Sequence, residues 1–254
     1  MARESKGKSL IKITPHWLAR LYDGKAGAVL LLLVSLFFPF HNVNAESYAL
    51  ELFQEVAEKG DARAQSILGS LYYYGVGLPQ SEAKAFQWYR AAAEGGEGLA
   101  QFNLGVMYYN GEGTNRNRYE ALKWFHKVSD QGMQLDETVP DVVSWAQLKL
   151  GFMYHDGKVT APNDVEALYW FRRAADRGVP LAQYMLGQMF HKGRGAPQDA
   201  VRAFMWYELA TLSGNKEAKQ GRSQILDQLT PGQIDQGRQM TEEWYRNTGN
   251  KRVN

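Results

Sequence analysis

Apolar residues recur at helical spacing in four segments of the chain. In each segment an alanine is followed by apolar side chains four, seven and eight positions later, which places all four on one side of a 3.6-residue helix. The four sets are Ala64, Leu68, Leu71 and Tyr72; Ala100, Leu104, Met107 and Tyr108; Ala146, Leu150, Met153 and Tyr154; and Ala182, Leu186, Met189 and Phe190. The pattern predicts four amphipathic helices, each burying its stripe.

A second marker keeps the same register and predicts a second helix after each of these. Trp followed by Tyr or Phe occurs at Trp88, Trp124, Trp170 and Trp206, and a Leu-Gly pair stands in each stripe. Both markers repeat every 36 residues, except for an interval of 46 between the second and third copies. Two markers with one period indicate an array of helix pairs. We expect the periodic Trp to pack between helices.

Glycines separate the helices of this array. Gly75, Gly111 and Gly193 follow the first helices, where a left-handed C-cap is expected. The glycine after each stripe leucine lies inside a helix, where it costs about 1 kcal/mol relative to alanine. We therefore expect a neighbouring helix to approach closely there. No strand precedes any of these glycines, so they are turns and not nucleotide-binding loops.

The same register extends beyond the four pairs. Backwards, it predicts a second-type helix through Leu52 and Phe53 that ends at Gly60, with Ser47 as its N-cap. Forwards, it predicts a first-type helix over 216–229. Thr230 and Pro231 then begin a more polar final helix, expected to reach about Trp244, which would cap the array.

The units resemble the Sel-one-like repeat family, whose pattern is A-x3-LG-x2-Y-x2-G-x-G followed by A-x2-W-Y-x2-AA-x2-G. The resemblance covers Glu46 to about Gly214 and departs locally at Val159, Phe190 and Lys127-Val128-Ser129. It implies an all-α fold, a right-handed α-solenoid of antiparallel helix pairs like those of tetratricopeptide proteins. Repeats are expected over 46–229, and a capping helix with a tail over 230–254.

Residues 1–45 have the pattern of a signal peptide. An apolar run of 15 residues, 26–40, follows several cationic residues and is shorter than the roughly 20 that span a bilayer. Val43-Asn44-Ala45 then offers a cleavage site before Glu46. We expect a periplasmic or secreted protein in a bacterial envelope. The alternative is an uncleaved leader, which would then be the chain's only contact with the membrane.

Charge and composition narrow the function. The formal net charge is +2, but the leader carries six basic and two acidic residues, so the remainder is slightly acidic. This argues against a nucleic-acid partner. There are no cysteines, which excludes disulfides and thiolate zinc sites. His155 and His191 occupy equivalent positions in adjacent repeats but lack a third ligand. We therefore predict no catalytic residue, no metal site and no cofactor.

Solenoids bind partners on the concave surface made by their first helices. Positions two, six and nine after the stripe alanine lie about opposite the stripe at 100° per residue. They form an unexpectedly apolar and aromatic row in the middle repeats, which predicts a groove for an extended peptide or a partner helix. The alternative is that adjacent helices bury them. The candidate residues are Phe102, Val106, Tyr109, Leu148, Phe152, His155, Tyr184, Gln188 and His191.

The interval of 46 instead of 36 leaves ten extra residues between the second and third repeats, within 132–143. They belong either to a binding rim or to a surface loop that tolerates insertions.

Together with the resemblance, these features predict an exported protein–protein interaction adaptor or regulator. Its partner would be an envelope sensor or a secretion component. The alternative is a hydrolase acting on cell-wall or β-lactam substrates, since some exported relatives were assigned that activity. Those relatives are cysteine-rich, and this chain has no cysteine.

Overall fold

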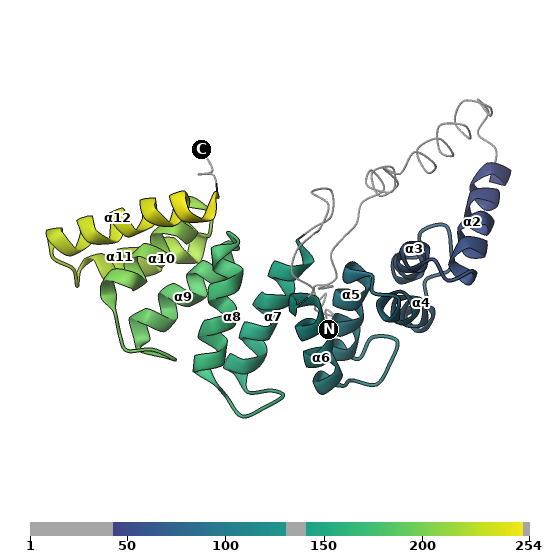
Figure 1. Ribbon diagram of the computed structural model, residues 1–254, viewed down its shortest axis with the longest axis horizontal. Coiled ribbons are helices and arrows are strands. Elements are labelled where there is room, and N and C mark those ends of the chain that lie inside the picture. The colour runs from purple at the N-terminus through teal and green to yellow at the C-terminus, as the bar shows by residue number, and fades with distance from the viewer. Residues whose placement is uncertain (1–42, 131–140, 251–254) are drawn as a thin grey trace, which may run out of the picture. The chain divides into compact units, whose positions relative to one another are not determined.

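The computed structural model describes residues 43–130 and 141–250, and side chains from Leu50 onward (Figure 1). These ranges hold eleven α-helices and no strand. Most of the predicted leader and of the predicted insertion lies outside them. Among the described residues, no helix is both long and apolar enough to cross a lipid bilayer.

The chain forms two compact units, which we call the N-terminal unit, Met1–Val142, and the C-terminal unit, Val143–Asn254. The helices of the N-terminal unit are α2 (Val43–Glu58), α3 (Ala62–Tyr74), α4 (Glu82–Glu94), α5 (Gly98–Asn110) and α6 (Arg118–Asp130). The helices that follow are α7 (Val142–Asp156), α8 (Asp164–Asp176), α9 (Pro180–Lys192), α10 (Ala200–Leu212), α11 (Lys216–Leu226) and α12 (Pro231–Thr248). In the N-terminal unit each helix packs against the next, and in the C-terminal unit α9 packs against α8 and α10, and α10 against α11. The predicted all-α solenoid of antiparallel pairs is therefore confirmed.

The expected helix boundaries are confirmed with three differences. Gly75, Gly111 and Gly193 are left-handed C-caps with φ of 69°, 77° and 66°. The helix α2 begins at Val43, before the expected cap Ser47. The helix α11 ends at Leu226, three residues early, and α12 continues to Thr248.

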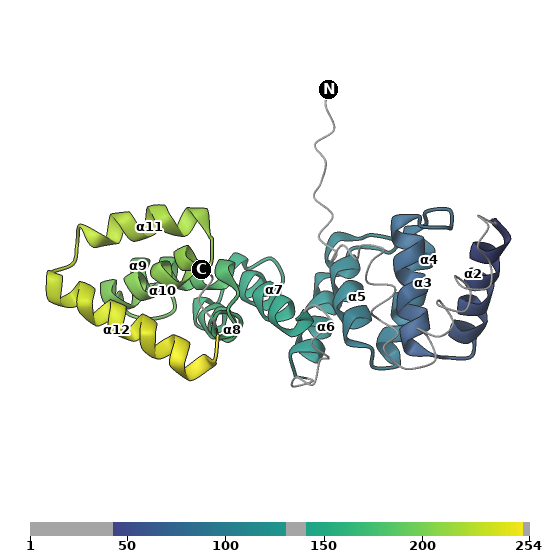
Figure 2. The ribbon, with the colours of Figure 1, turned by 90° about the horizontal axis from the view of Figure 1, so that it is seen from above.

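The C-terminal helix α12 starts as predicted and packs on α10. Thr230 is its N-cap and shares a capping box with Gln233, while Pro231 lies in the first turn. In Figure 2, α10 lies between α11 and α12 and contacts both. This contact covers part of α10 with a more polar helix, which is what the end of an array needs.

The two sequence markers meet in space. In every repeat, the aromatic residue after Trp lies against the glycine after the stripe leucine. A methyl group at that glycine would stand between 2.5 and 2.8 Å from a ring carbon. The pairs are Gly69 with Tyr89, Gly105 with Phe125, Gly151 with Phe171 and Gly187 with Tyr207. The expected close approach is therefore confirmed, and the approaching group is a ring from the second helix of the same pair.

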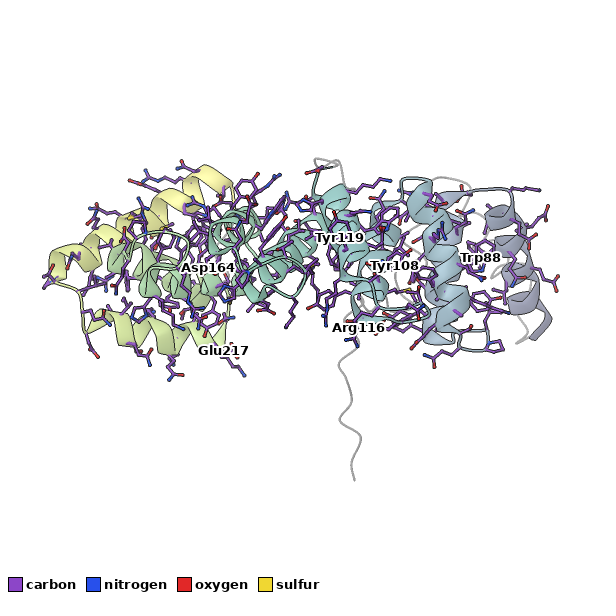
Figure 3. All side chains as sticks on the ribbon, turned by 90° about the horizontal axis from the view of Figure 1, so that it is seen from below. Trp88, Tyr108, Arg116, Tyr119, Asp164 and Glu217 are labelled. Carbon is purple, nitrogen blue, oxygen red and sulfur yellow. The ribbon has the colours of Figure 1, made fainter. Side chains whose placement is uncertain are left out.

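The periodic Trp residues differ in burial. Trp170 and Trp206 are buried, as expected of core residues. Trp88 on α4 (labelled in Figure 3) and Trp124 on α6 are only half-buried. The expectation that the periodic Trp packs between helices is therefore met fully in the C-terminal unit and only partly in the N-terminal unit.

A glutamine directly after the stripe alanine joins neighbouring pairs. The side-chain amides of Gln65 and Gln101 donate to the main-chain oxygens of Ala57 and Ala93, at 3.0 and 3.1 Å. Each acceptor lies in the last turn of the preceding helix, whose carbonyls lack partners within the helix. Glutamine follows the alanine in all four repeats, which is the sequence signal for this contact.

Candidate partner-binding face

Three of the nine predicted binding residues are not available at the surface. Phe102, Val106 and Leu148 are at most 3% exposed, so their predicted exposure is wrong and the alternative of burial holds for them. The other six are partly exposed, and their role in binding stays a prediction. These six are Tyr109, Phe152, His155, Tyr184, Gln188 and His191.

The buried part of this row faces the second helix of its own repeat. Positions two, six and nine after the alanine surround the glycine at position five, and the ring of the second helix lies on that glycine. Ring centroids are accordingly close, at 5.6 Å for Phe102 and Phe125 and 5.1 Å for Phe152 and Phe171. The first helix is thus covered on two sides: neighbouring residues pack on its apolar stripe, and the ring of the second helix packs on its glycine. Its exposed side is the remaining arc and does not lie opposite the stripe.

That arc contains two exposed apolar residues that the spacing argument missed. Trp145 on α7 is 45% exposed and Leu181 on α9 is 38% exposed. Each stands directly before the stripe alanine, about 260° round the helix from it at 100° per residue. The residue type gives no clear sequence signal for exposure, because this position is apolar in three of the four repeats. In the N-terminal unit the same position holds exposed Arg63 and buried Leu99.

We call the surface formed by Trp145, Phe152, Leu181, Tyr184 and Gln188 the first-helix face. All five come from α7 and α9, the first helices of adjacent repeats in the C-terminal unit. Phe152, Tyr184 and Gln188 are partly exposed. The amide nitrogen of Gln188 donates to the hydroxyl oxygen of Tyr184 at 2.6 Å. The face therefore combines apolar anchors with a positioned hydrogen-bonding pair.

The two equivalent histidines lie at the ends of these helices and are held in place. The Nδ1 atom of His155 is 2.7 Å from Oδ1 of Asp164, the first residue of α8. Asp164 is labelled in Figure 3. The Nε2 atom of His191 is 3.3 Å from the side-chain amide nitrogen of Gln228. Because that amide only donates, Nε2 of His191 is the acceptor. Both imidazoles also contact the rings that cover the glycines, Phe171 and Tyr207.

Charged groups surround the face without forming a metal site. Lys149 lies one turn beyond Trp145 on α7, and burial lowers the pKa of its ammonium group. Asp156 and Lys192 are exposed at the ends of α7 and α9. Among the described residues, no three His, Cys, Asp or Glu side chains gather as metal ligands would. The expectation of no metal, no cofactor and no catalysis stays a prediction.

The comparisons with known proteins decide the family. The profile of the Sel1 repeat matches four consecutive segments, 62–97, 98–133, 146–179 and 180–215, which together make up more than half of the chain. The chain belongs to the Sel1 repeat family. Each matched segment of this Sel1 repeat protein begins at or near a first helix, in agreement with the helix pairs described above. No curated protein matches the chain.

Solved Sel1 repeat structures resemble the chain. A Sel1 repeat protein from Oxalobacter formigenes is 28% identical with a TM-score of 0.59, over 83% of this chain and 57% of its own. A protective antigen of uropathogenic Escherichia coli with the same repeat fold is 25% identical with a TM-score of 0.48, over 84% and 51%. A protein described as a Sel1 repeat protein from Klebsiella pneumoniae is 20% identical with a TM-score of 0.45, over 78% and 92%. The chain thus spans little more than half the length of the first two.

Membership of the family carries a general expectation about function. Sel1 repeat proteins generally mediate protein–protein interactions, and they bind protein partners. The family is typically a non-catalytic scaffold.

Proposed function

We propose that this Sel1 repeat protein is an adaptor that binds a protein or peptide partner on the first-helix face of its C-terminal unit. The observation that carries the proposal is the exposure of Trp145 and Leu181 at equivalent positions of adjacent repeats. Exposed apolar side chains that cluster on one face are typical of partner-binding surfaces.

The chemistry of the face suits such a partner. Tryptophan is enriched among the residues that dominate binding energy, because a large rigid side chain buries much area at low entropic cost. Phe152 and Tyr184 extend the apolar area, and each packs on the ring of the second helix behind it. Gln188 can hydrogen-bond a peptide backbone. The backbone positions of these anchors are fixed by helix packing before the partner arrives.

The test is affinity capture from an envelope extract after crosslinking in cells. We compare the unaltered chain with the double variant Trp145→Ser/Leu181→Ser. A matched control is Val165→Ser/Tyr169→Ser on α8, because these two residues are 64% and 50% exposed but lie outside the face. We expect one specific envelope protein to be captured by the unaltered chain and the control, and lost with the face variant.

Capture that survives in the face variant would refute the proposed surface. Loss in both double variants would mean that exposed apolar residues act without regard to position, which also contradicts it. Circular dichroism of both variants should match the unaltered chain, since all four substituted side chains are exposed. Phe102 is unsuitable for this test because it is buried.

We also propose that the chain is exported, with a partner in the bacterial envelope such as a sensor or a secretion component. The apolar run 26–40, the cationic residues before it and Val43-Asn44-Ala45 support this. The helix α2 begins at Val43, so the proposed cleavage site after Ala45 falls in its first turn. Removal of the leader would shorten α2 by three residues and would leave the four repeats intact.

A further inference from the structure

The exposed arc of α7 carries a lysine between its aromatic residues. At 100° per residue, Trp145, Lys149, Phe152 and Asp156 lie within about 60° of one another round the helix. Trp145 is 45% exposed, and Lys149 and Phe152 are partly exposed. Spacings of four and three residues make Lys149 a neighbour of both rings on the helix surface. The ammonium group is therefore placed within the first-helix face.

Lys149 has no counter-charge. Among the described residues, no carboxylate pairs with it, and Asp156 on the same arc pairs with Lys158 at 2.7 Å. Burial lowers the pKa of the Lys149 ammonium group, and no neighbouring charge contributes to this shift. An ammonium group that loses water without gaining a carboxylate costs stability. The free chain therefore keeps an unfavourable group in the middle of a binding surface.

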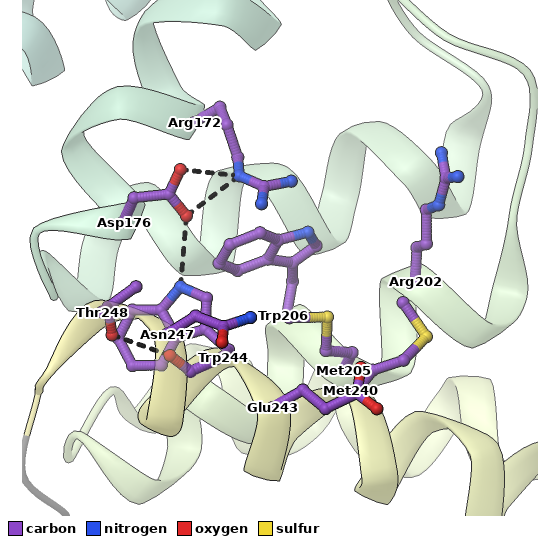
Figure 4. Close-up of a pocket in the computed structure, with 10 residues that line it drawn as sticks. All are labelled: Arg172, Asp176, Arg202, Met205, Trp206, Met240, Glu243, Trp244, Asn247 and Thr248. Carbon is purple, nitrogen blue, oxygen red and sulfur yellow. Dashed lines mark hydrogen bonds and ion pairs between the residues drawn. The ribbon is translucent and has the colours of Figure 1, made fainter.

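Other basic side chains of the C-terminal unit have carboxylate partners. The helices α8, α10 and α12 line a pocket of about 400 Å³, in which Nε of Arg172 donates to both oxygens of Asp176, each at 2.9 Å (Figure 4). Nη1 of Arg222 lies 2.7 Å from a carboxylate oxygen of Glu208. A carboxylate from a partner finds these guanidinium groups already neutralised, whereas Lys149 is not.

Packing does not require a lysine at this position. The equivalent residues of the other repeats, three places after the stripe alanine, are Ile67, Asn103 and Met185, and each is at most 9% exposed. All three are neutral. At the end of α9, Lys192 is exposed on the corresponding arc and has no ion pair among the described residues. The first-helix face thus lies beside two ammonium groups that the chain itself does not neutralise.

We propose that the partner of the first-helix face presents a carboxylate to Lys149, from an aspartate or glutamate with apolar residues beside it. This inference rests on the proposed function and names the chemistry of the partner. The carboxylate accepts a charge-assisted hydrogen bond from the ammonium group, in surroundings that Trp145 and Phe152 shield from water. The apolar residues of the partner lie on Trp145 and Leu181. A basic segment is rejected, because it would leave two like charges together.

Peptide selection with the full chain tests the inference. A phage library of random heptapeptides is first depleted on the immobilised Trp145→Ser/Leu181→Ser variant. This step removes peptides that bind elsewhere, including those that bind the cationic residues before the apolar run 26–40. The remaining phages are selected on the unaltered chain. We expect the enriched peptides to carry Asp or Glu beside apolar residues. Enriched peptides without an acidic residue would overturn the inference and leave the proposed face in place.

A double-mutant cycle assigns the carboxylate to Lys149. A selected peptide and its amide version, with Asn for Asp or Gln for Glu, are titrated by fluorescence polarisation against the unaltered chain and against Lys149→Met. Each single change should weaken binding at least tenfold. The two changes together should cost little more than either one, since they remove the same pair. Losses that multiply would place the carboxylate elsewhere on the face and overturn the assignment.

Lys149→Met is expected to fold, because Met185 fills the equivalent position of α9. Its free energy of unfolding should equal or exceed that of the unaltered chain, which separates lost affinity from lost structure. Lys149→Arg should retain binding within about threefold. Lys216→Met is the matched control, since Lys216 is an exposed lysine on α11 outside the face. Unchanged affinity in Lys149→Met would overturn the inference alone. No enriched peptide after depletion would overturn the proposed face and the inference with it.

Discussion

The ring of Tyr207 occupies the space that a side chain at position 187 would need, which is why Gly187 fits there. The Cβ atom of an alanine there would stand 2.5 Å from Cδ1 of Tyr207, a ring that is buried between helices. We expect Gly187→Ala to lower the free energy of unfolding by about 1–3 kcal/mol, since overpacking outweighs the gain in helix propensity. Urea unfolding followed by circular dichroism measures the change.

Gly232 provides the control for this substitution. It lies in the first turn of α12, and a Cβ atom at this position would have no heavy atom within 4 Å. Gly232→Ala should leave stability unchanged or raise it by up to about 1 kcal/mol. If Gly187→Ala were as stable as Gly232→Ala, the ring contact would not be the reason for glycine at this position.

Tyr207 should make the C-terminal unit sensitive to alkaline pH. Burial raises the pKa of its hydroxyl from 10.0 to about 12. Between these values the unfolded chain loses the proton while the folded chain keeps it. The stabilisation is therefore complete below pH 10 and is lost as pH rises toward 12, at up to about 1.4 kcal/mol per pH unit.

The variant Tyr207→Phe tests this directly. It should show a smaller loss of unfolding free energy between pH 9 and pH 11 than the unaltered chain, as measured by urea titrations at each pH. Tyr169→Phe, at a ring that is 50% exposed, serves as the control. If the unfolding free energy fell equally with rising pH in the unaltered chain and in Tyr207→Phe, Tyr207 would not be the source of the alkaline sensitivity.

At the scale of elements, the loop between paired helices also joins one repeat to the previous one. Gly113 has a φ of 65° and lies against the main-chain oxygen of Glu82, the first residue of α4. A side chain at this position would overlap that backbone. Gly195 lies in the same way against Asp164 at the start of α8. The second loop glycine therefore lets the loop of one pair touch the helix of the pair before it.

The comparison of Gly113→Ala with Gly77→Ala isolates this contact. Gly77 occupies the same loop position with a φ of 68°, but nothing lies within 4 Å of its Cβ position. Gly77→Ala should cost about 1 kcal/mol from the left-handed backbone alone. Gly113→Ala should cost about 1–3 kcal/mol more because the backbone of α4 cannot yield. Equal losses in urea unfolding would show that the loop does not support packing between repeats.

At the scale of the whole molecule, export is the property that the sequence argues most directly. We expect cell fractionation to place the chain in the periplasm or the medium, and N-terminal sequencing of the purified protein to start at Glu46. Replacement of two leucines in the run 26–40 by arginine should retain the chain in the cytoplasm. A chain that keeps residues 1–45 and stays in the membrane fraction would support the uncleaved anchor instead.

The repeat, its helix pairs and its glycine caps could be predicted from sequence because they depend on local rules. Helical period, C-cap geometry and the recurrence of Trp and Leu-Gly act within one unit of 36 residues. The start of α12 at Thr230 and Pro231 and the close approach at Gly187 belong to the same class. The ends of α2, α11 and α12 were less predictable, because packing against neighbouring helices extends or shortens a helix beyond its own signals.

The binding surface could not be placed by the same rules. Its exposed arc depends on how many sides of a first helix are covered, and the ring over the glycine covers a second side that the stripe does not reveal. Phe102, Val106 and Leu148 are therefore buried where the spacing predicts exposure, while Trp145 and Leu181 are exposed at a position that the spacing does not select.

The sequence by itself determined the family, the helix pairs and their register, since these follow from a pattern that repeats along the chain. Only the tertiary structure decided which arc of α7 and α9 is exposed, and that Trp244 on α12 donates a hydrogen bond to Asp176 on α8. The physical reason is that exposure and such contacts depend on helices that are far apart in the chain. Trp244 and Asp176 are 68 residues apart, and no local signal connects them.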